Sequence, residues 1–227
     1  MPAHADLRIQ ELPVRVDVDV VTLAGDLSLP EGARGLVLFA HGSGSGRFST
    51  RNRYVARMLN EGRLATLLID LLTEEEEEYD QQNALLRFDI PMLAQRLVGA
   101  TDWLAREPMT RNLRVGYFGA STGAGAALVA AAERPDRVGA VVSRGGRPDL
   151  AGDALARVRA PTLLIVGGND QVVIKLNEMA FSQLNCDKSL VIIPGATHLF
   201  PEPGALDEVA RLARDWFERY LPPDENA

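Results

Sequence analysis

Short apolar segments alternate along this chain with longer segments in which apolar residues recur at helical spacing. Residues 14–20 alternate strictly between apolar and polar, which predicts a strand with one solvated face that pairs with 21–29 as a hairpin or as edge strands. The later strand candidates are almost continuously apolar, as strands buried on both faces of a parallel sheet are: 36–40, 65–69, 115–118, 138–142, 162–166 and 190–193.

Amphipathic segments of helical length separate these strands. They are 51–61, 87–106, 122–133, 172–184 and 204–220. The alternation predicts an α/β fold in which about eight mostly parallel strands carry helices on both faces. No repeat or linker divides the chain, so a single domain over 1–227 is expected, with no large cap domain and with loose termini at 1–12 and 222–227.

Composition narrows the class of protein. Of 227 residues, 46% are hydrophobic and 24% are charged, which is the balance of a soluble globular protein. The formal charge of −7 argues against nucleic acid as a partner. No segment is long and apolar enough for a membrane span or a signal peptide, so a cytoplasmic location is expected. A single cysteine, Cys186, excludes an internal disulfide and a multi-cysteine zinc site.

Much of the acidity comes from one segment, 74–78, which consists of five consecutive glutamates. It follows a predicted strand end, and two interpretations stay open. The segment is either a self-repelling loop at the rim of a site or the start of a helix, where acidic residues are favoured. Consecutive carboxylates point in different directions and no histidine lies nearby, so we expect no metal site here, and no motif calls for a cofactor.

The strongest chemical motif is Gly119-Ala120-Ser121-Thr122-Gly123. It joins the apolar segment 115–118 to an alanine-rich helical segment, and in this context G-x-S-x-G forms a nucleophile elbow. Small residues two positions before and after the serine let strand and helix approach closely, and the helix N-terminus favours a developing anion. Ser121 is therefore the candidate nucleophile. The alternative is an ordinary serine that caps a helix.

A serine nucleophile needs a base, and the chain has three histidines. The order in α/β-hydrolases is serine, then acid, then histidine, and only His198 lies downstream of Ser121. His4 has no motif around it, and His41 precedes a glycine-rich loop. His198 is therefore the predicted base, with an exposed loop histidine as the alternative.

The acid is expected after a strand that lies between these two residues. Asp170 follows the apolar segment 162–166 through Gly-Gly-Asn, and there it could orient the imidazole and stabilise its protonated form. Asp149 and Asp153 follow the preceding strand and are second choices. The competing interpretation of Asp170 is a turn residue that caps the next helix.

Two backbone N–H groups are expected to hold the oxyanion of a tetrahedral intermediate. Thr122 supplies one as the residue after the nucleophile, and Ser43 supplies the other from the loop 41–46, His-Gly-Ser-Gly-Ser-Gly. A phosphate-binding loop is the less favoured interpretation, because the full glycine-lysine and three-glycine motifs are absent.

Four motifs thus occur in order, at 41–44, 119–123, 168–170 and 196–198. Together they resemble the α/β-hydrolases and, more narrowly, the compact dienelactone-hydrolase-like branch, over about 14–221. The resemblance implies an eight-stranded sheet and a Ser-His-Asp triad for ester or acyl hydrolysis. Dienelactone hydrolases proper use a cysteine nucleophile, whereas this elbow carries Ser121 and Cys186 lies away from it. The resemblance therefore implies the scaffold and serine-esterase chemistry, but not lactone hydrolysis.

Arginines follow two strand ends that face the predicted site. Arg47, Arg51 and Arg53 come after the third strand, and Arg144 and Arg147 come after the segment 138–142. Guanidinium groups bind carboxylate or phosphate, so an anionic substrate is one hypothesis. Arg144 is the best candidate for binding the anion, and Arg147 and Arg47 are the further candidates. Solvated side chains in an arginine-rich chain are the other interpretation.

The sequence therefore predicts a serine hydrolase that cleaves a small ester or thioester through an acyl-enzyme. A peptidase or acyltransferase on the same triad stays open, because a scaffold does not fix the acyl acceptor. A noncatalytic binding module is the alternative from another class of protein. The expected partner is a small molecule, and the sequence leaves the oligomeric state open.

Overall fold

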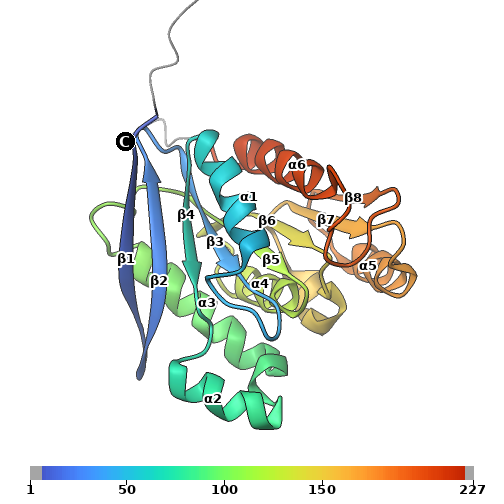
Figure 1. The fold of residues 1–227 in the computed structure, drawn as a ribbon, viewed down its shortest axis with the longest axis horizontal. Coiled ribbons are helices and arrows are strands. Elements are labelled where there is room, and N and C mark those ends of the chain that lie inside the picture. The colour runs from blue at the N-terminus through green and yellow to red at the C-terminus, as the bar shows by residue number, and fades with distance from the viewer. Residues whose placement is uncertain (1–6, 223–227) are drawn as a thin grey trace, which may run out of the picture.

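In the computed structural model, which describes residues 7–222, eight strands form one sheet in the order β1-β2-β4-β3-β5-β6-β7-β8 (Figure 1). β1 and β2 are antiparallel to their neighbours, and β3 to β8 are mutually parallel. The strands are β1 (Ile9–Val18), β2 (Val21–Pro30), β3 (Gly35–Ala40), β4 (Leu64–Ile69), β5 (Val115–Ala120), β6 (Val138–Arg144), β7 (Thr162–Gly167) and β8 (Lys188–Ile193).

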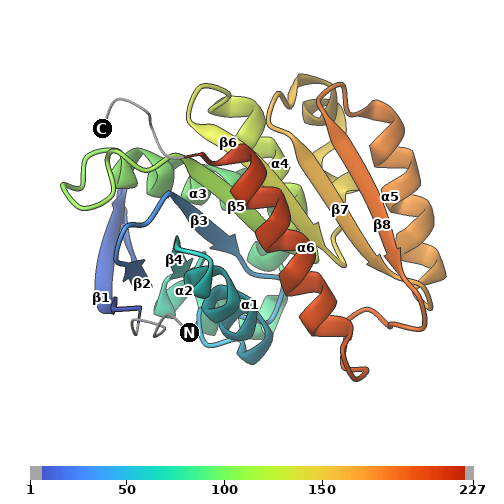
Figure 2. The same ribbon diagram turned by 90° about the horizontal axis from the view of Figure 1, so that it is seen from above.

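Helices cover both faces of this sheet (Figure 2). α1 (Thr50–Glu61) and α6 (Ala205–Tyr220) pack together on one face, and α3 (Ile90–Leu104), α4 (Thr122–Glu133) and α5 (Gln171–Gln183) lie on the other. Short 3₁₀ helices span Leu86–Phe88 and Pro148–Arg157, and α2 (Glu74–Asn83) follows β4. The predicted α/β architecture with an eight-stranded, mostly parallel sheet is confirmed.

The burial of the strands follows the hydrophobic pattern. Every residue of β3, β4, β5, β6 and β7 is buried, because helices lie on both sides of them. β8 is less buried than its apolar sequence suggests, since it forms an edge of the sheet. β1 has the predicted solvated face.

The boundaries of two elements differ from the sequence expectation. Residues 9–12, which we expected in a loose terminus, belong to β1, because they pair with the segment of β2 from Leu27 to Pro30. Residues 1–6 and 223–227 lie outside the described part of the chain. The expected helix 87–106 begins only at Ile90, where Asp89 accepts a hydrogen bond from the Met92 N–H and Pro91 occupies the first turn.

The glutamate run opens α2, so the helical interpretation of this segment is the correct one. Thr73 and Glu76 form a reciprocal capping box, and four glutamates lie in the first turn. Negative charge is favoured there by the partial positive charge of a helix N-terminus. α2 projects beyond the sheet at the lower edge of Figure 1, next to the ends of the parallel strands.

Within residues 7–222, no helix combines the length and the apolar character that crossing a bilayer requires.

Candidate active site

The junction of β5 and α4 forms a sharp turn at Ser121. Its backbone has φ 51° and ψ −123°, a conformation that a residue with a side chain rarely adopts. A Cβ atom on Gly119 would lie 2.5 Å from the Ala124 Cα, and one on Gly123 would lie 2.3 Å from the Ala40 carbonyl oxygen. Only glycine fits at both positions, so the small residues of the motif bring strand and helix together around Ser121.

Two loops from neighbouring strands enclose Ser121. From the loop after β3, a Cβ on Gly42 would lie 3.0 Å from the Ser121 Cβ. From the end of β6, the Arg144 carbonyl accepts the Ser121 N–H at 3.4 Å, and the Arg147 N–H donates to the Ser121 carbonyl at 2.9 Å. Ser121 itself is partly exposed. Its hydroxyl therefore sits at the carboxyl end of the sheet, where ligands of open α/β sheets bind.

Asp170 and His198 meet at this same end. The Asp170 Oδ2 lies 2.7 Å from the His198 Nδ1. The Asp170 side chain makes no capping bond to α5, and it lies at the end of β7 as expected. With Nδ1–H donated to the carboxylate, the other ring nitrogen is left as an acceptor. A Cβ on Gly145 would lie 2.8 Å from the His198 carbonyl oxygen, so the histidine loop packs against the strand end that also holds Ser121.

The second-choice acids are placed differently. Asp149 makes a two-pronged ion pair with Arg147, at 2.7 and 2.8 Å. Asp153 is exposed on the 3₁₀ helix Pro148–Arg157. Of the three candidate acids, Asp170 is the one that the structure joins to His198.

His41 joins two loops through hydrogen bonds that its sequence context did not predict. Its Nε2 accepts the Leu71 N–H at 2.9 Å, and its Nδ1 lies 3.0 Å from the Gly42 carbonyl, to which it donates. Burial lowers the pKa of His41 below its ordinary value of 6.5, so the ring is neutral at neutral pH. This side chain ties the start of the glycine-rich loop to the end of β4. His41 and Leu71 are thirty positions apart in the sequence, and no local sequence pattern predicts their contact.

Ser43 and Thr122, the residues that carry the candidate oxyanion donors, are in direct contact. The Ser43 N–H donates to the Thr122 Oγ1 at 3.0 Å, and Thr122 is the first residue of α4. This bond holds the loop after β3 against the start of α4, next to Ser121. In the free protein the Ser43 N–H is therefore hydrogen-bonded to the threonine hydroxyl.

The five arginines near the site fall into two groups. Arg47 pairs with Asp70, Arg53 pairs with Asp26 at 3.0 Å, and Arg147 pairs with Asp149. Arg144 and Arg51 have no salt bridge within the described residues. Arg144 is 6% exposed and makes one long hydrogen bond, 3.3 Å from its Nη2 to the Asn52 Oδ1. Asn52 was not singled out from the sequence, where a polar residue in a first helical turn carries no such signal.

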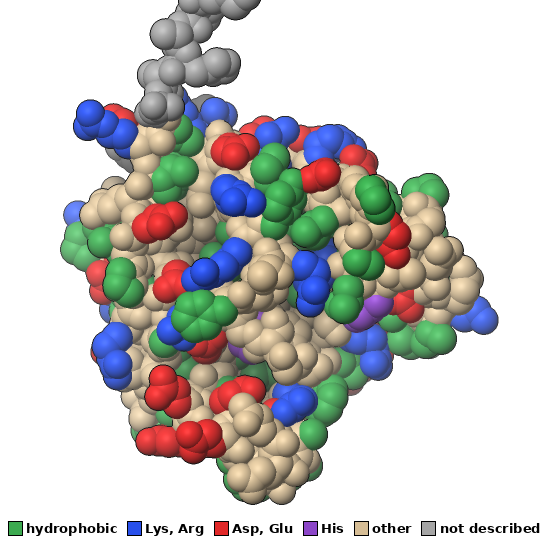
Figure 3. Space-filling model, viewed as in Figure 1, with side chains coloured by type: hydrophobic (Ala, Val, Ile, Leu, Met, Phe, Trp, Pro, Cys, Tyr) green, Lys and Arg blue, Asp and Glu red, His purple; other side chains and the backbone are tan. Residues whose placement is uncertain are grey.

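A cleft of about 570 Å³ runs from the glycine-rich loop to α2. Its walls include His41, Phe48, Asp70, Glu74 and Glu77. A separate small hollow, which His41 and Glu77 also line, borders Ser43 and Thr122, and neither lining includes Ser121, Asp170 or His198. In Figure 3 acidic side chains gather at the lower left, over α2. A hollow of about 600 Å³ between β2 and α1 contains none of the candidate catalytic residues.

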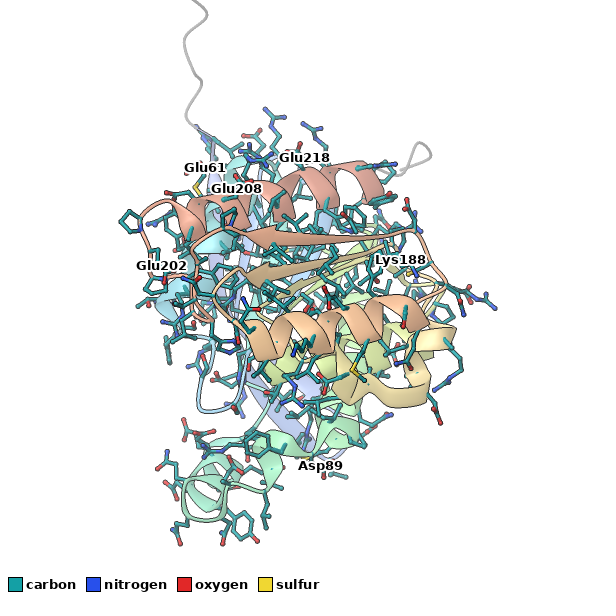
Figure 4. All side chains as sticks on the ribbon, turned by 90° about the vertical axis from the view of Figure 1, so that its right-hand side faces the viewer. Glu61, Asp89, Lys188, Glu202, Glu208 and Glu218 are labelled. Carbon is teal, nitrogen blue, oxygen red and sulfur yellow. The ribbon has the colours of Figure 1, made fainter. Side chains whose placement is uncertain are left out.

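The two ends of the sheet are distinguished in Figure 4. Lys188 marks the start of β8, and Glu202 lies in the loop beyond its end, on the side from which the α2 region projects. The candidate catalytic loops and the cleft therefore share one end of the molecule.

A family model matches this chain: that of the dienelactone hydrolase family matches residues 23–222. The chain is 58% identical over 219 residues to a putative phosphoribosyl transferase of Mycobacterium tuberculosis. The match covers 96% of this chain and 48% of the relative. The chain thus spans about half the length of that curated relative.

Solved structures show the same fold. A dienelactone hydrolase from Anabaena variabilis superposes with a TM-score of 0.93 at 66% identity, covering 94% of this chain and 99% of that one. Est1E from Butyrivibrio proteoclasticus superposes with a TM-score of 0.76 at 17% identity, covering 92% and 98% of the two chains. The second likeness concerns the fold alone.

Proposed function

Given that this chain belongs to the dienelactone hydrolase family, we propose that it is a hydrolase that cleaves a small ester or thioester with Ser121 as nucleophile. His198 is the base and Asp170 the acid. The observation that supports the proposal is the 2.7 Å contact between His198 and Asp170, at the end of the sheet where Ser121 occupies a strained turn. The relative named as a phosphoribosyl transferase is about twice as long, so its name is not transferred to this chain.

Acylation begins when the Ser121 Oγ attacks the carbonyl carbon of the ester. The hydroxyl proton passes to the His198 Nε2, and the resulting imidazolium is stabilised by the Asp170 carboxylate. The tetrahedral intermediate then expels the alcohol or thiol, which takes that proton from His198. An acyl-Ser121 ester remains.

The negative charge of the intermediate falls next to Thr122 and Ser43. The N–H groups of these residues are the proposed donors, and the N-terminus of α4 adds its partial positive charge. Because the Thr122 hydroxyl accepts the Ser43 N–H in the free protein, that hydroxyl must turn aside or share the donor when the oxyanion forms. Water activated by His198 then attacks the acyl carbonyl, and Ser121 is regenerated.

The hypothesis of an anionic substrate now depends on fewer arginines. Arg47 and Arg147 are engaged by Asp70 and Asp149, so their predicted role in binding substrate would require exchange of these partners. Within residues 7–222, Arg144 is engaged by no carboxylate. We therefore place the predicted anion recognition at Arg144.

A fluorophosphonate probe tests the nucleophile directly. It should label wild-type protein at Ser121, and Ser121→Ala and His198→Ala should abolish labelling and lower ester hydrolysis by at least about 10³-fold. Asp170→Asn should lower kcat by about 10³ to 10⁴-fold, because the imidazole then adopts the wrong tautomer. Asp153→Asn is the matched control and should leave the rate unchanged. Folded wild-type protein that takes up no label would favour the noncatalytic binding module.

The acyl acceptor requires product analysis. With an activated ester, the acyl-enzyme should give free acid in water and little transfer product when alcohols or amines are added. Predominant transfer to an alcohol would identify an acyltransferase, and cleavage of an amide at a similar rate would identify a peptidase.

A further inference from the structure

Arg144 and Arg51 stand apart from the other arginines around the site. In residues 7–222, no carboxylate lies within 4.0 Å of either guanidinium, whereas Arg53 and Arg147 each have one and Arg47 has two. The Nε atoms of Arg144 and Arg51 are also buried without a hydrogen-bond partner, as is that of Arg47. The protein therefore leaves two neighbouring positive charges without a counter-charge of its own.

Such an arrangement is unfavourable in the free protein. Burial of a charge is costly unless the charge is paired, and two like charges repel. Burial, followed by the nearby Arg51, lowers the pKa of Arg144 to about 10, which still leaves the side chain protonated at neutral pH. Arg144 thus keeps its charge with no carboxylate beside it.

The surroundings add positive potential. Arg51 and Asn52 lie in the first turn of α1, where backbone N–H groups lack partners inside the helix and the helix dipole is positive. Ser49 accepts one of these N–H groups, that of Asn52. The centre of the Phe200 ring lies 6.0 Å from the Arg144 guanidinium. None of these groups carries a negative charge.

This cluster is also joined to the reacting groups. The Arg144 carbonyl accepts the Ser121 N–H, and the adjacent Gly145 packs against the His198 backbone. Phe200 follows His198 by two residues. The two arginines therefore border the loops that carry the candidate reacting groups.

Building on the proposed function, we propose that Arg144, Arg51 and Asn52, with the first turn of α1, bind a doubly charged phosphate monoester group carried by the ester substrate. The phosphate is a recognition group and stays intact while the ester is cleaved. Two guanidinium groups and a helix N-terminus exceed the charge of one carboxylate, whereas a phosphate monoester carries about −1.5 to −2 and three acceptor oxygens. Guanidinium forks match these oxygens geometrically.

Three p-nitrophenyl esters with the same four-methylene spacer test this specificity. They are 5-phosphonopentanoate, hydrogen adipate and methyl adipate, whose distal groups are a phosphonate that carries up to two charges, a singly charged carboxylate and a neutral ester. Wild-type protein should prefer the phosphonate over the neutral ester by roughly tenfold to a hundredfold in kcat/KM, the size expected for one or two charge-assisted hydrogen bonds. The background rate is taken from Ser121→Ala. Equal rates on all three esters, or a preference for the adipate monoanion, would overturn the assignment.

Variants test which residues cause the preference for the phosphonate ester. Arg51→Gln and Arg144→Gln should each remove most of it, measured within each variant as the ratio of kcat/KM on the phosphonate to kcat/KM on methyl adipate. Arg57→Gln changes the same charge on the exposed part of the same helix and should keep the preference. Because Arg144 is buried, Arg51→Gln carries the test if Arg144→Gln fails to fold. Retention of the phosphonate preference in Arg51→Gln would contradict the two-arginine site.

Binding can be measured without the reaction. Inorganic phosphate should raise the Tm of wild-type protein and of Ser121→Ala, and should not raise that of Arg51→Gln. If no ester is hydrolysed but phosphate still stabilises through Arg51, the proposed function fails and the anion site stands. If esters are hydrolysed with no preference and phosphate has no effect, the anion site fails and the proposed function stands.

Discussion

The turn at Ser121 and the segment of residues 73–89, which we call the α2 segment, border the same site but are held by different forces. Around the turn, nine residues of α4 are buried, and the glycines at 119 and 123 leave no room for a methyl group. In α2 the only buried residue is Asp80. The α2 segment is held by a capping box, by the pair of Asp80 with Arg87 and by a 2.6 Å ion pair from Glu76 to Arg96.

This difference assigns two roles to two regions: one positions the candidate nucleophile, and the other borders the cleft. Close packing allows little displacement, so a turn held by packing keeps the candidate nucleophile in one place. Polar contacts at a surface exchange with water at low net cost, so a segment held by them can open locally while the core stays folded. The packed region carries the proposed chemistry, and the polar region forms a wall of the cleft.

The largest effect is expected from Gly123→Ala. The added Cβ would meet the backbone oxygens of Ala40 and His41 at 2.3 and 2.4 Å, and neither can move without displacing β3. The free energy of unfolding, measured by chemical denaturation, should fall by about 3 kcal/mol or more. Gly152→Ala is the control, because Gly152 has φ 51° but open space around it, so a loss of only about 1 kcal/mol is expected. Equal losses would show that packing does not fix the turn.

His41→Gln should change how stability depends on pH. Burial lowers the pKa of His41, so the unfolded chain binds the proton more readily than the folded protein does. Stability is therefore fully present above the ordinary pKa of 6.5 and falls as the pH drops below it, by at most about 1.4 kcal/mol per pH unit. Glutamine can still accept the Leu71 N–H but does not titrate.

The readout is the difference between the two unfolding free energies from pH 7.5 to pH 5, in which the contributions of all other groups cancel. The wild-type curve should be the steeper one. Parallel curves would mean that His41 is not held neutral by its burial.

A local effect is expected from Asp80→Asn. Burial alone would raise the pKa of the Asp80 carboxyl, but hydrogen bonds from Arg87 and from the backbone outweigh burial and hold the pKa below its ordinary value. Loss of the charge should speed amide exchange across the α2 segment roughly tenfold, with little change in Tm. Asp102→Asn breaks a comparable pair with Arg134 elsewhere and should leave this exchange unchanged. A cooperative loss of global stability in Asp80→Asn would place the segment in the core.

The smallest effect is expected at the exposed glutamates. Glu74→Gln combined with Glu75→Gln removes two charges from the first turn of α2, where each is worth about 0.3–1 kcal/mol at most. Amide exchange in α2 should change less than in Thr73→Ala, which removes the capping hydroxyl. The reverse order would assign the stability of α2 to its charges.

The sequence predicted most of the fold because its strongest signals are local. Continuous apolar segments identified the buried strands, and Gly119 and Gly123 announced a sharp turn at Ser121. Chain order selected His198 and Asp170, which the structure places 2.7 Å apart. Assignments of this kind depend on residues close in sequence or on the order of strands in one sheet.

What the sequence could not supply is long-range pairing. The contact from Arg144 to Asn52 spans ninety-two positions, and the charge state of the site depends on which arginine meets which carboxylate. Arg47 and Arg144 look alike in sequence, yet one is neutralised by Asp70 and the other is not. The extent of β1 likewise depends on its partner strand, since residues 9–12 are ordered by pairing with β2.

The positive φ of Ser121 lowers the free energy of unfolding of the protein. Holding a residue with a side chain in this conformation costs of order 1–3 kcal/mol, which the packing around the turn must offset. Glycine adopts the same conformation freely, so a variant that has lost the hydroxyl to Ser121→Gly should unfold at a higher temperature than the active protein. Serine at position 121 therefore lowers the stability of the fold, and the glycine variant would regain that stability by giving up the hydroxyl.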